Sequence, residues 1–130
     1  MFSLFLLLSL SLNAQYNTPQ NKIWIFGNQS GFDFNNGYPV AVTSNMNAGN
    51  NTGTLEANTS VCDSNGALLF YTDGVTVWNK QHQVMVNGNG LQGNPSGLQN
   101  VIIVPDAVQN ALYHIWTVDP RIQTSVDMSL

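Results

Sequence analysis

Candidate calcium ligands occur at two places in the chain, each with oxygen-bearing side chains two residues apart and a glycine close behind. The first pair is Asp33 and Asn35, and the second is Asp63 and Asn65. This spacing is typical of part of an EF-hand loop, although neither segment has the glutamate that closes such a loop. A hairpin turn explains Asp63 and Asn65 more simply. Asp33 and Asn35 have no obvious hairpin partner, so they are the predicted metal ligands, and no cofactor other than calcium is suggested.

The side chains that most often catalyse hydrolysis are few in this protein. Nucleophilic catalysis needs a base and an orienting group beside the nucleophile, and His82 and His114 are the only histidines. His82 falls in a predicted turn, His114 falls in a predicted strand, and no nucleophile-elbow pattern is present. Glycoside hydrolysis needs paired carboxylates, but Glu56 is the single glutamate and the aspartates mostly occupy turn positions. We therefore predict that this protein has no catalytic residues here and is not itself an enzyme.

Cys62 is the only cysteine, so the protein forms no internal disulfide. It ends the alternating stretch 57–62, where a small buried apolar side chain is a simpler interpretation than a reactive thiol. A protein of this size without an internal disulfide has to be held together by its apolar core.

The three tryptophans, Trp24, Trp78 and Trp116, allow two interpretations. They could be platforms that stack on carbohydrate, or they could fill the space between packed sheets. Because aromatic side chains bury the most apolar area per residue, packing is the favoured interpretation.

The composition excludes some partners. Charged residues make up 8% of the sequence, against roughly 25% in an ordinary soluble domain. The formal net charge is −4, and Lys22, Lys80 and Arg121 are the only basic residues apart from the histidines. Nucleic acids and anionic membranes attract clustered Lys and Arg, so neither is expected as a partner. Polarity comes instead from many Asn and Gln side chains, which suits loop-rich β structure.

The elements that position these residues are predicted to be strands. No window has apolar residues at helical spacing over three turns, so the fold class is all-β. Runs rich in β-branched and aromatic residues, bounded by Gly, Asn and Asp, mark the strands. The predicted strands are 23–26, 59–62, 67–72, 75–78, 83–86, 101–104 and 111–118.

The strands are predicted to form antiparallel four-stranded meanders. Asn65-Gly66 predicts a two-residue type I′ hairpin, and Asp73-Gly74 is a second hairpin signal. A meander over about 57–86 matches one full blade of a β-propeller, and a second, truncated blade begins at about 100. Two similar aromatic strands lie about 45 residues apart, which is the spacing of propeller blades. A partial β-propeller is therefore predicted, with a β-sandwich as the alternative because it uses the same meanders.

The two ends of the sequence hold further signals. Residues 1–14 are predicted to be a signal peptide, because Phe2–Leu12 is an apolar run of the right length and too short for a membrane span. Cleavage is expected between Ala14 and Gln15, although no Lys or Arg precedes the run. The mature region, 15–130, is expected to have no transmembrane segment. Its last residues, Thr124–Leu130, alternate like a strand and stop without a turn, so we expect an incomplete propeller region.

Two blocks of sequence and several shorter segments together resemble the N-terminal region of one protein family. Trp24–Phe34 reads WIFGNQSGFDF, and Ser64–Asn79 reads SNGALLFYTDGVTVWN. The shorter segments 82–85, 87–88, 102–105, 113–119 and 126–130 continue the pattern in order. These blocks are similar to motifs of large secreted proteins of the Bacteroidota that carry a type-B sorting domain, labelled gliding motility-associated, at the C-terminus. The residues shared with the family motifs are Trp24, Phe26, Gly27, Asp33, Phe70, Tyr71, Asp73, Gly74, Trp78 and Asn79.

The resemblance implies a fold and a destination. In the family this region looks like the start of a β-propeller, and the sorting domain usually lies far downstream and directs export by the type IX secretion system. The protein is therefore expected to interact with the export machinery and to be secreted or held at the outer cell surface. The family has no well-defined catalytic residues in this region to carry over.

Two functions are compatible with these patterns. The first is an interaction or adhesion scaffold that binds a glycan or a protein at the cell surface. The alternative is the N-terminal part of a secreted propeller hydrolase or lyase that acts on polysaccharide, with its catalytic residues outside this sequence.

Overall fold

The structure is a computed structural model, and it describes residues 18–46, 56–109 and 111–118. These residues form nine strands in three antiparallel sheets, with one short 3-10 helix, η2 (Pro19–Asn21), before the first strand. The all-β prediction is confirmed. The predicted signal peptide with its cleavage site at Ala14 and Gln15, and the segment Thr124–Leu130, lie outside the described residues.

The first sheet contains two strands that the sequence did not predict. Its order is β1 (Ile23–Phe26), β2 (Ser30–Asp33) and β3 (Val40–Thr43). Glycine weakens a strand signal, and β2 contains Gly31. In the sheet this glycine is needed, because a Cβ at Gly31 would lie 2.5 Å from the carbonyl oxygen of Trp24.

The second sheet is the predicted four-stranded meander. It comprises β4 (Thr59–Cys62), β5 (Leu68–Thr72), β6 (Thr76–Asn79) and β7 (Val84–Asn89), and neighbours in the sequence are neighbours in the sheet. The third sheet pairs β8 (Val101–Pro105) with β9 (Tyr113–Thr117).

The turns of the second sheet correct the type I′ prediction. A type I′ turn needs positive φ at both central residues. Gly66 and Gly74 both have φ of 85°, but neither Asn65 nor Asp73 has positive φ. Five residues separate β4 from β5, and three separate β5 from β6. The aspartate side chains build these longer turns by accepting hydrogen bonds from backbone N–H groups further along the turn.

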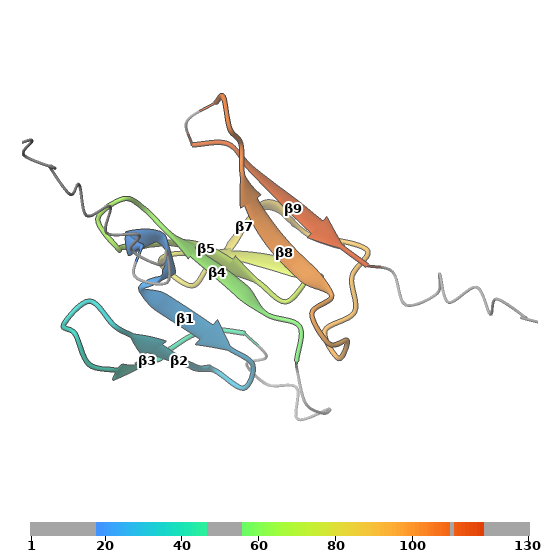
Figure 1. The fold of residues 1–130 in the computed structure, drawn as a ribbon. Coiled ribbons are helices and arrows are strands. Elements are labelled where there is room, and N and C mark those ends of the chain that lie inside the picture. Colours follow the sequence, from blue (N-terminus) through green and yellow to red (C-terminus); the bar gives the residue numbers. More distant parts are fainter. Residues whose placement is uncertain (1–17, 47–55, 110, 119–130) are drawn as a thin grey trace, which may run out of the picture.

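The three sheets are stacked with the four-stranded sheet in the middle (Figure 1). The first strand of that sheet, β4, contacts the first strand of each neighbouring sheet, β1 and β8. Each of these three strands is also an edge strand of its own sheet. The stack therefore brings three sheet edges together along one side.

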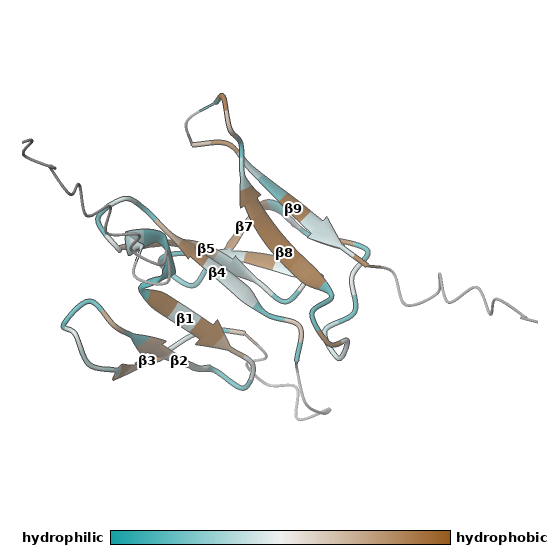
Figure 2. Cartoon of the chain, viewed as in Figure 1, coloured by the Kyte–Doolittle hydropathy of each residue, from teal (hydrophilic) through white to brown (hydrophobic). Residues whose placement is uncertain are grey.

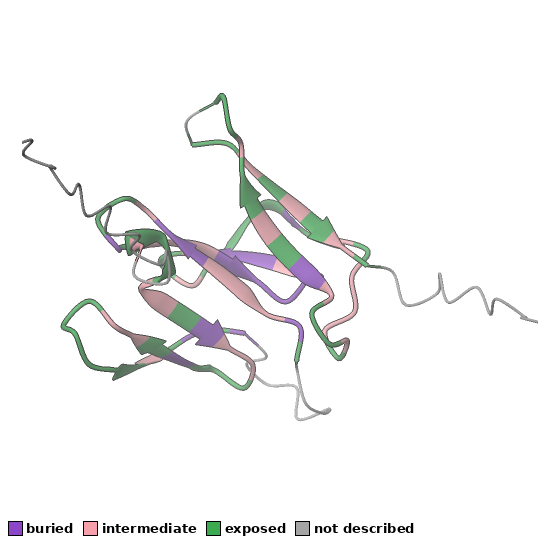
Figure 3. Ribbon diagram, in the orientation of Figure 1, coloured by how far each residue is buried: buried purple, intermediate pink, exposed green. Residues whose placement is uncertain are grey.

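Apolar side chains meet where the first and second sheets stack. Figure 2 shows β1 and β8, the two strands that contact β4, largely in brown. Between the first and second sheets the buried cluster is Ile25, Met46, Tyr71 and Trp78. The rings of Tyr71 and Trp78 are stacked at 5.3 Å with an interplanar angle of 13°. Buried residues concentrate in the middle sheet, whereas the outer sheets are mostly exposed or intermediate (Figure 3).

None of the described residues belongs to a helix long and apolar enough to cross a membrane.

Candidate functional site

The predicted calcium ligands lie together in an Asx turn that follows β2. Asp33 Oδ1 accepts hydrogen bonds of 2.8 Å from both the backbone N and the amide Nδ2 of Asn35. Asn35 Nδ2 also donates to the carbonyl oxygen of Gly66, at 3.0 Å. The Asn35 side chain therefore ties the end of the first sheet to the β4–β5 turn of the second. Its contacts are those of a structural link, and calcium binding here stays a prediction.

Tyr71, in the middle of the segment Ser64–Asn79, builds the contact between the first and second sheets. Tyr71 is fully buried, and its hydroxyl oxygen lies 3.0 Å from the backbone N of Asn45 and 3.1 Å from Nδ1 of His82. Asn45 Nδ2 donates in turn to the carbonyl oxygen of His82 at 2.8 Å. Burial raises the pKa of the Tyr71 phenol above its ordinary value. The phenol is therefore held in its protonated form, as a network member inside the molecule.

The three residues that follow Tyr71, 72–74, form a buried turn against the third sheet. Thr72 and Asp73 are both buried, and Asp73 Oδ1 accepts from the backbone N of Val75 and of Thr76 at 2.9 and 2.7 Å. An added Cβ at Gly74 would lie 3.4 Å from Val101 of β8. A buried aspartate that accepts two backbone hydrogen bonds is fully explained by its turn.

The remaining residues of the motif have separate structural roles. Phe70 packs edge-to-face on Tyr113 of β9, with ring centroids 5.4 Å apart. Asn79 Oδ1 accepts hydrogen bonds from the backbone N of Gln81 and of Gln83, both at 2.9 Å, and so shapes the turn before β7. Gly27 opens the β1–β2 turn, where the next two residues, Asn28 and Gln29, have positive φ.

Cys62 is a free, fully buried thiol at the end of β4, which confirms the packing interpretation. Its burial is the main cause that raises the pKa of the thiol above the ordinary value. A thiol that resists ionisation is a poor nucleophile.

The two histidines lie in different parts of the fold. His82 contacts Tyr71 between the first and second sheets. His114 lies on β9, and its Nε2 is 2.9 Å from Oδ2 of Asp106. This contact, with two backbone hydrogen bonds from Gln109 and Val108, lowers the pKa of the Asp106 carboxyl to about 2.

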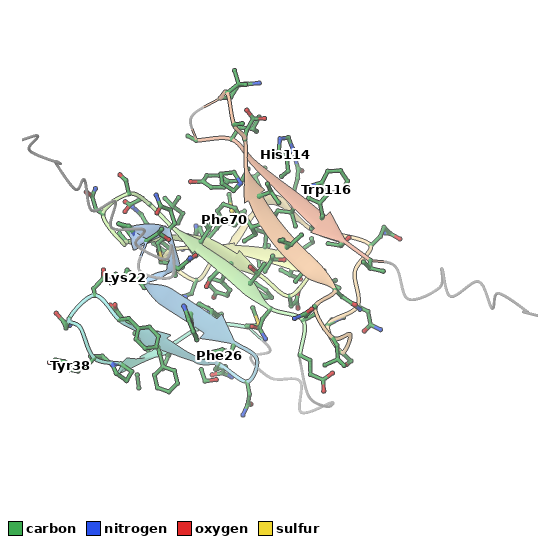
Figure 4. The ribbon with its side chains drawn as sticks, viewed as in Figure 1. Lys22, Phe26, Tyr38, Phe70, His114 and Trp116 are labelled. Atoms are coloured by element: carbon green, nitrogen blue, oxygen red, sulfur yellow. The ribbon has the colours of Figure 1, made fainter. Side chains whose placement is uncertain are left out.

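Aromatic and aliphatic side chains cover the outer face of each end sheet. On the first sheet the rings of Trp24, Phe26, Phe32 and Phe34 contact one another in a series, with centroids 5.1 to 6.4 Å apart. We call these four side chains the first end face. On the third sheet the exposed side chains pair across the strands as Ile102 with Trp116 and Val104 with His114, and they form the second end face. Figure 4 shows Trp116 and His114 beside β9 at one end of the stack and Phe26 at the other.

The three tryptophans therefore differ in burial. Trp78 is buried against Tyr71, as the packing interpretation predicted. Trp24 is 50% exposed and Trp116 is 66% exposed, each on an end face. Within the described residues neither of these two side chains is buried between sheets.

A groove of about 560 Å³ opens beside β9, over the face of the second sheet that looks toward the third. Phe70, Met85 and Tyr113 are among its apolar lining residues, and Gln20 and Asp63 are among its polar lining residues. A smaller groove, of about 200 Å³, lies along β1 and β4. Apolar concave surfaces with a few polar groups are the usual form of ligand sites, so the larger of these two grooves is a candidate site.

No three or more His, Cys, Asp or Glu side chains gather into a metal-binding group within residues 18–46, 56–109 and 111–118. Comparisons of the sequence and fold with protein-family models, with curated proteins and with solved structures found no match. The function is therefore inferred from the residues and geometry of the protein itself.

Two side chains that connect the first and second sheets could not be identified from the sequence. Ser60 Oγ donates to the carbonyl oxygen of Ile23 at 2.7 Å and accepts from the backbone N of Ile25 at 3.3 Å. The second is Asn45, which joins the Tyr71 network. Nothing in the local sequence distinguishes this Ser and this Asn from the many others in the protein.

Proposed function

We propose that the three sheets are consecutive blades of a β-propeller and that the protein is part of an exported interaction scaffold. The observation that supports the proposal is the contact of β4 with both β1 and β8, which are the first strands of their sheets. In a propeller the sheets are arranged around a central channel, so one edge strand of each faces the axis. A sandwich packs two sheets face to face, whereas the middle sheet here has a neighbour on each face.

The two end faces support the same proposal. Face-to-face packing of the first sheet on the second, and of the second on the third, buries apolar side chains at each contact. The end faces have the same kind of side chain and are exposed. In a ring, each would pack against a further blade, and their exposure in the described residues would disappear.

Function as a scaffold is proposed because the described side chains whose types could take part in catalysis or metal binding are engaged in turns and packing. Asp33, Asp63 and Asp73 build turns, and His82 joins a buried network. The proposal includes surface interaction with a glycan or a protein and export through a signal peptide at 1–14, which the sequence patterns favour. Type IX secretion is included because the family resemblance implies it. No observation on the described residues favours the hydrolase or lyase alternative.

Electron microscopy of the complete gene product tests the architecture. The expected particle is a ring of blades around a central channel. A two-layer particle without a channel would contradict the propeller and favour the sandwich.

Binding to a panel of immobilised glycans tests the scaffold role, with the Tyr113→Ala variant as the probe of the larger groove and Val86→Ala as the matched control on β7. If the groove takes a sugar, Tyr113→Ala should weaken binding at least about tenfold, because aromatic stacking and the apolar wall are both lost. Equal binding by both variants and the parent protein would remove the groove from the proposal.

A further inference from the structure

The protein has four Asn-Gly pairs, at 36–37, 65–66, 87–88 and 89–90. Asn followed by Gly is the pair most prone to spontaneous deamidation, because glycine has no Cβ to hinder approach of its backbone nitrogen to the Asn side chain. From the local structure of the four pairs we infer that Asn89 is the main deamidation site of the folded protein, and that the other three react more slowly.

The reaction needs only water. The backbone nitrogen of Gly90 loses its proton and attacks Cγ of Asn89. A new bond forms between that nitrogen and Cγ, and the bond from Cγ to Nδ2 breaks to release ammonia. Water then opens the cyclic imide at one of its two carbonyls, which leaves either aspartate or isoaspartate. The net change is the exchange of an amide for a carboxylate, with a mass gain of about 1 Da per site, and no oxidation or reduction takes place.

Two of the four pairs have a buried glycine. Gly66 is buried, and its N–H donates to the carbonyl oxygen of Asp63 at 3.1 Å. Gly88 is buried within β7, and a Cβ there would lie 2.8 Å from the carbonyl oxygen of Val77. For either nitrogen to reach the Cγ of its asparagine, the surrounding backbone has to open first. The deamidation rate is therefore reduced by a factor that the free energy of that opening sets.

The third pair is exposed but tied. Gly37 has open space around its Cα, yet its N–H donates to the carbonyl oxygen of Phe34 at 3.1 Å. The turn is also held by the hydrogen bonds between Asn35 and Asp33. This pair should react at an intermediate rate.

The fourth pair has none of these restraints. Asn89 and Gly90 are both exposed, and Asn89 is the last residue of β7. Nothing lies within 4 Å of a Cβ built on Gly90. The Gly90 N–H has no acceptor among the residues that the structure describes. Among the four glycine nitrogens, that of Gly90 is therefore the one that is neither in a buried residue nor a donor to a carbonyl oxygen of the described residues.

The modification would act on the segment that joins the second sheet to the third. Asn89 pairs with Thr76 of β6, and Leu91 N donates to the carbonyl oxygen of Val75 at 3.0 Å. Isoaspartate inserts an extra methylene group into the backbone, which shifts one of these pairings out of register. It also makes the formal net charge of −4 more negative by one unit.

The test is site-resolved peptide mapping by mass spectrometry after incubation of the full-length protein at mildly alkaline pH, below its melting temperature. In the folded protein Asn89 should convert at least about tenfold faster than Asn65, the factor produced by about 1.4 kcal/mol of extra opening free energy. In denaturant the four rates should converge, because only the Asn-Gly sequence then matters. The Asn89→Gln variant should lose the fast phase of mass gain, since Gln forms its larger cyclic imide much more slowly, while Asn36→Gln keeps it.

Conversion of Asn65 or Asn36 as fast as Asn89 in the folded protein would overturn the inference, and so would a fast phase that survives in Asn89→Gln. Circular dichroism of each sample establishes that the protein is folded during the incubation. The mapping of the unmodified sequence decides the order of sites even where a variant does not fold.

Discussion

At the scale of single residues, short polar side chains build the turns of this protein. Asp33, Asp63, Asp73 and Asp106 each accept a hydrogen bond from a backbone N–H two residues further on. This places a carboxylate where a turn would otherwise leave donors unpaired. These four carboxylates therefore have a structural role in their turns, and calcium binding at Asp33 stays a prediction.

The buried turn at Gly74 provides a prediction on stability. Gly74→Val should lower the free energy of unfolding by about 1–2 kcal/mol or more, because left-handed φ is unfavourable for a β-branched residue. Here φ is 85°, and the turn also packs on Val101. Urea denaturation of the two proteins measures the difference.

Gly37→Val is the matched control for this change. Gly37 has φ of 81°, but nothing lies within 4 Å of its added Cβ. The control should therefore show the backbone cost alone and be the milder of the two. If both variants lose the same stability, the packing of Gly74 on the third sheet contributes nothing.

The Asp106–His114 pair provides a prediction on pH. The contact with His114 is the main cause of the lowered pKa of Asp106, about 2 against 3.8. Because the pKa of Asp106 is depressed in the folded state, this carboxylate stabilises the fold above about pH 4, and that contribution is lost as the pH falls through about 2. In the His114→Ala variant, an NMR titration should move the Asp106 midpoint upward, toward 3.8. His82→Gln should leave it unchanged, and a midpoint that also stays near 2 in His114→Ala would contradict the assignment.

At the scale of elements, the edge strands are joined by side chains rather than by ladder hydrogen bonds. β1 and β4 are edge strands of different sheets, and Ser60 of β4 bonds to the backbone of Ile23 and Ile25 in β1. An unpaired strand edge is prone to unwanted pairing, so this contact both closes the edge and fixes the first sheet on the second.

Removal of the Ser60 hydroxyl tests this link. Ser60→Ala should lower the free energy of unfolding by about 1–3 kcal/mol, because it leaves part-buried backbone groups of β1 unsatisfied. Ser30→Ala is the control, since Ser30 Oγ donates to the carbonyl oxygen of Gly27 at an exposed position. Thermal melts of both variants suffice. An effect of Ser60→Ala no larger than that of Ser30→Ala would mean that water replaces the hydroxyl.

At the scale of the whole molecule, apolar surface is distributed unevenly. The middle sheet is covered on both faces, whereas the two end faces have exposed aromatic and aliphatic side chains. Contiguous exposed apolar patches usually mark a surface that packs against something else. Both ends of the stack are therefore the surfaces at which this protein is expected to make further contacts.

The end faces should bind a dye that fluoresces on apolar surfaces. Ile102→Thr combined with Trp116→Ser removes a cross-strand pair from the second end face. The double variant should show lower dye fluorescence than the parent protein, while its far-ultraviolet circular dichroism stays the same. Val86→Thr is the matched control, because Val86 is 93% exposed but belongs to neither end face. Equal fluorescence in the two variants would mean that the dye binds elsewhere.

Local sequence determined the fold class and most of the strands. Alternation and β-branched content placed the strands 23–26 and 59–62 with the observed bounds, and those near 70, 77 and 103 within about a residue or two. These signals are local, because side-chain alternation and turn residues act over a few neighbouring positions. Burial of Cys62 and Trp78 followed from the same patterns.

Only the tertiary structure decided how these elements are joined. The short strands β2 and β3 have weak signals and gain their stability from pairing with β1 and with each other. The links from Asn35 to Gly66, from Ser60 to Ile23 and from Tyr71 to Asn45 connect residues 26 to 37 positions apart. Their partners are chosen by the stacking of the sheets, which no short window of sequence contains, because the free energy of each contact depends on groups that meet only after the protein has folded.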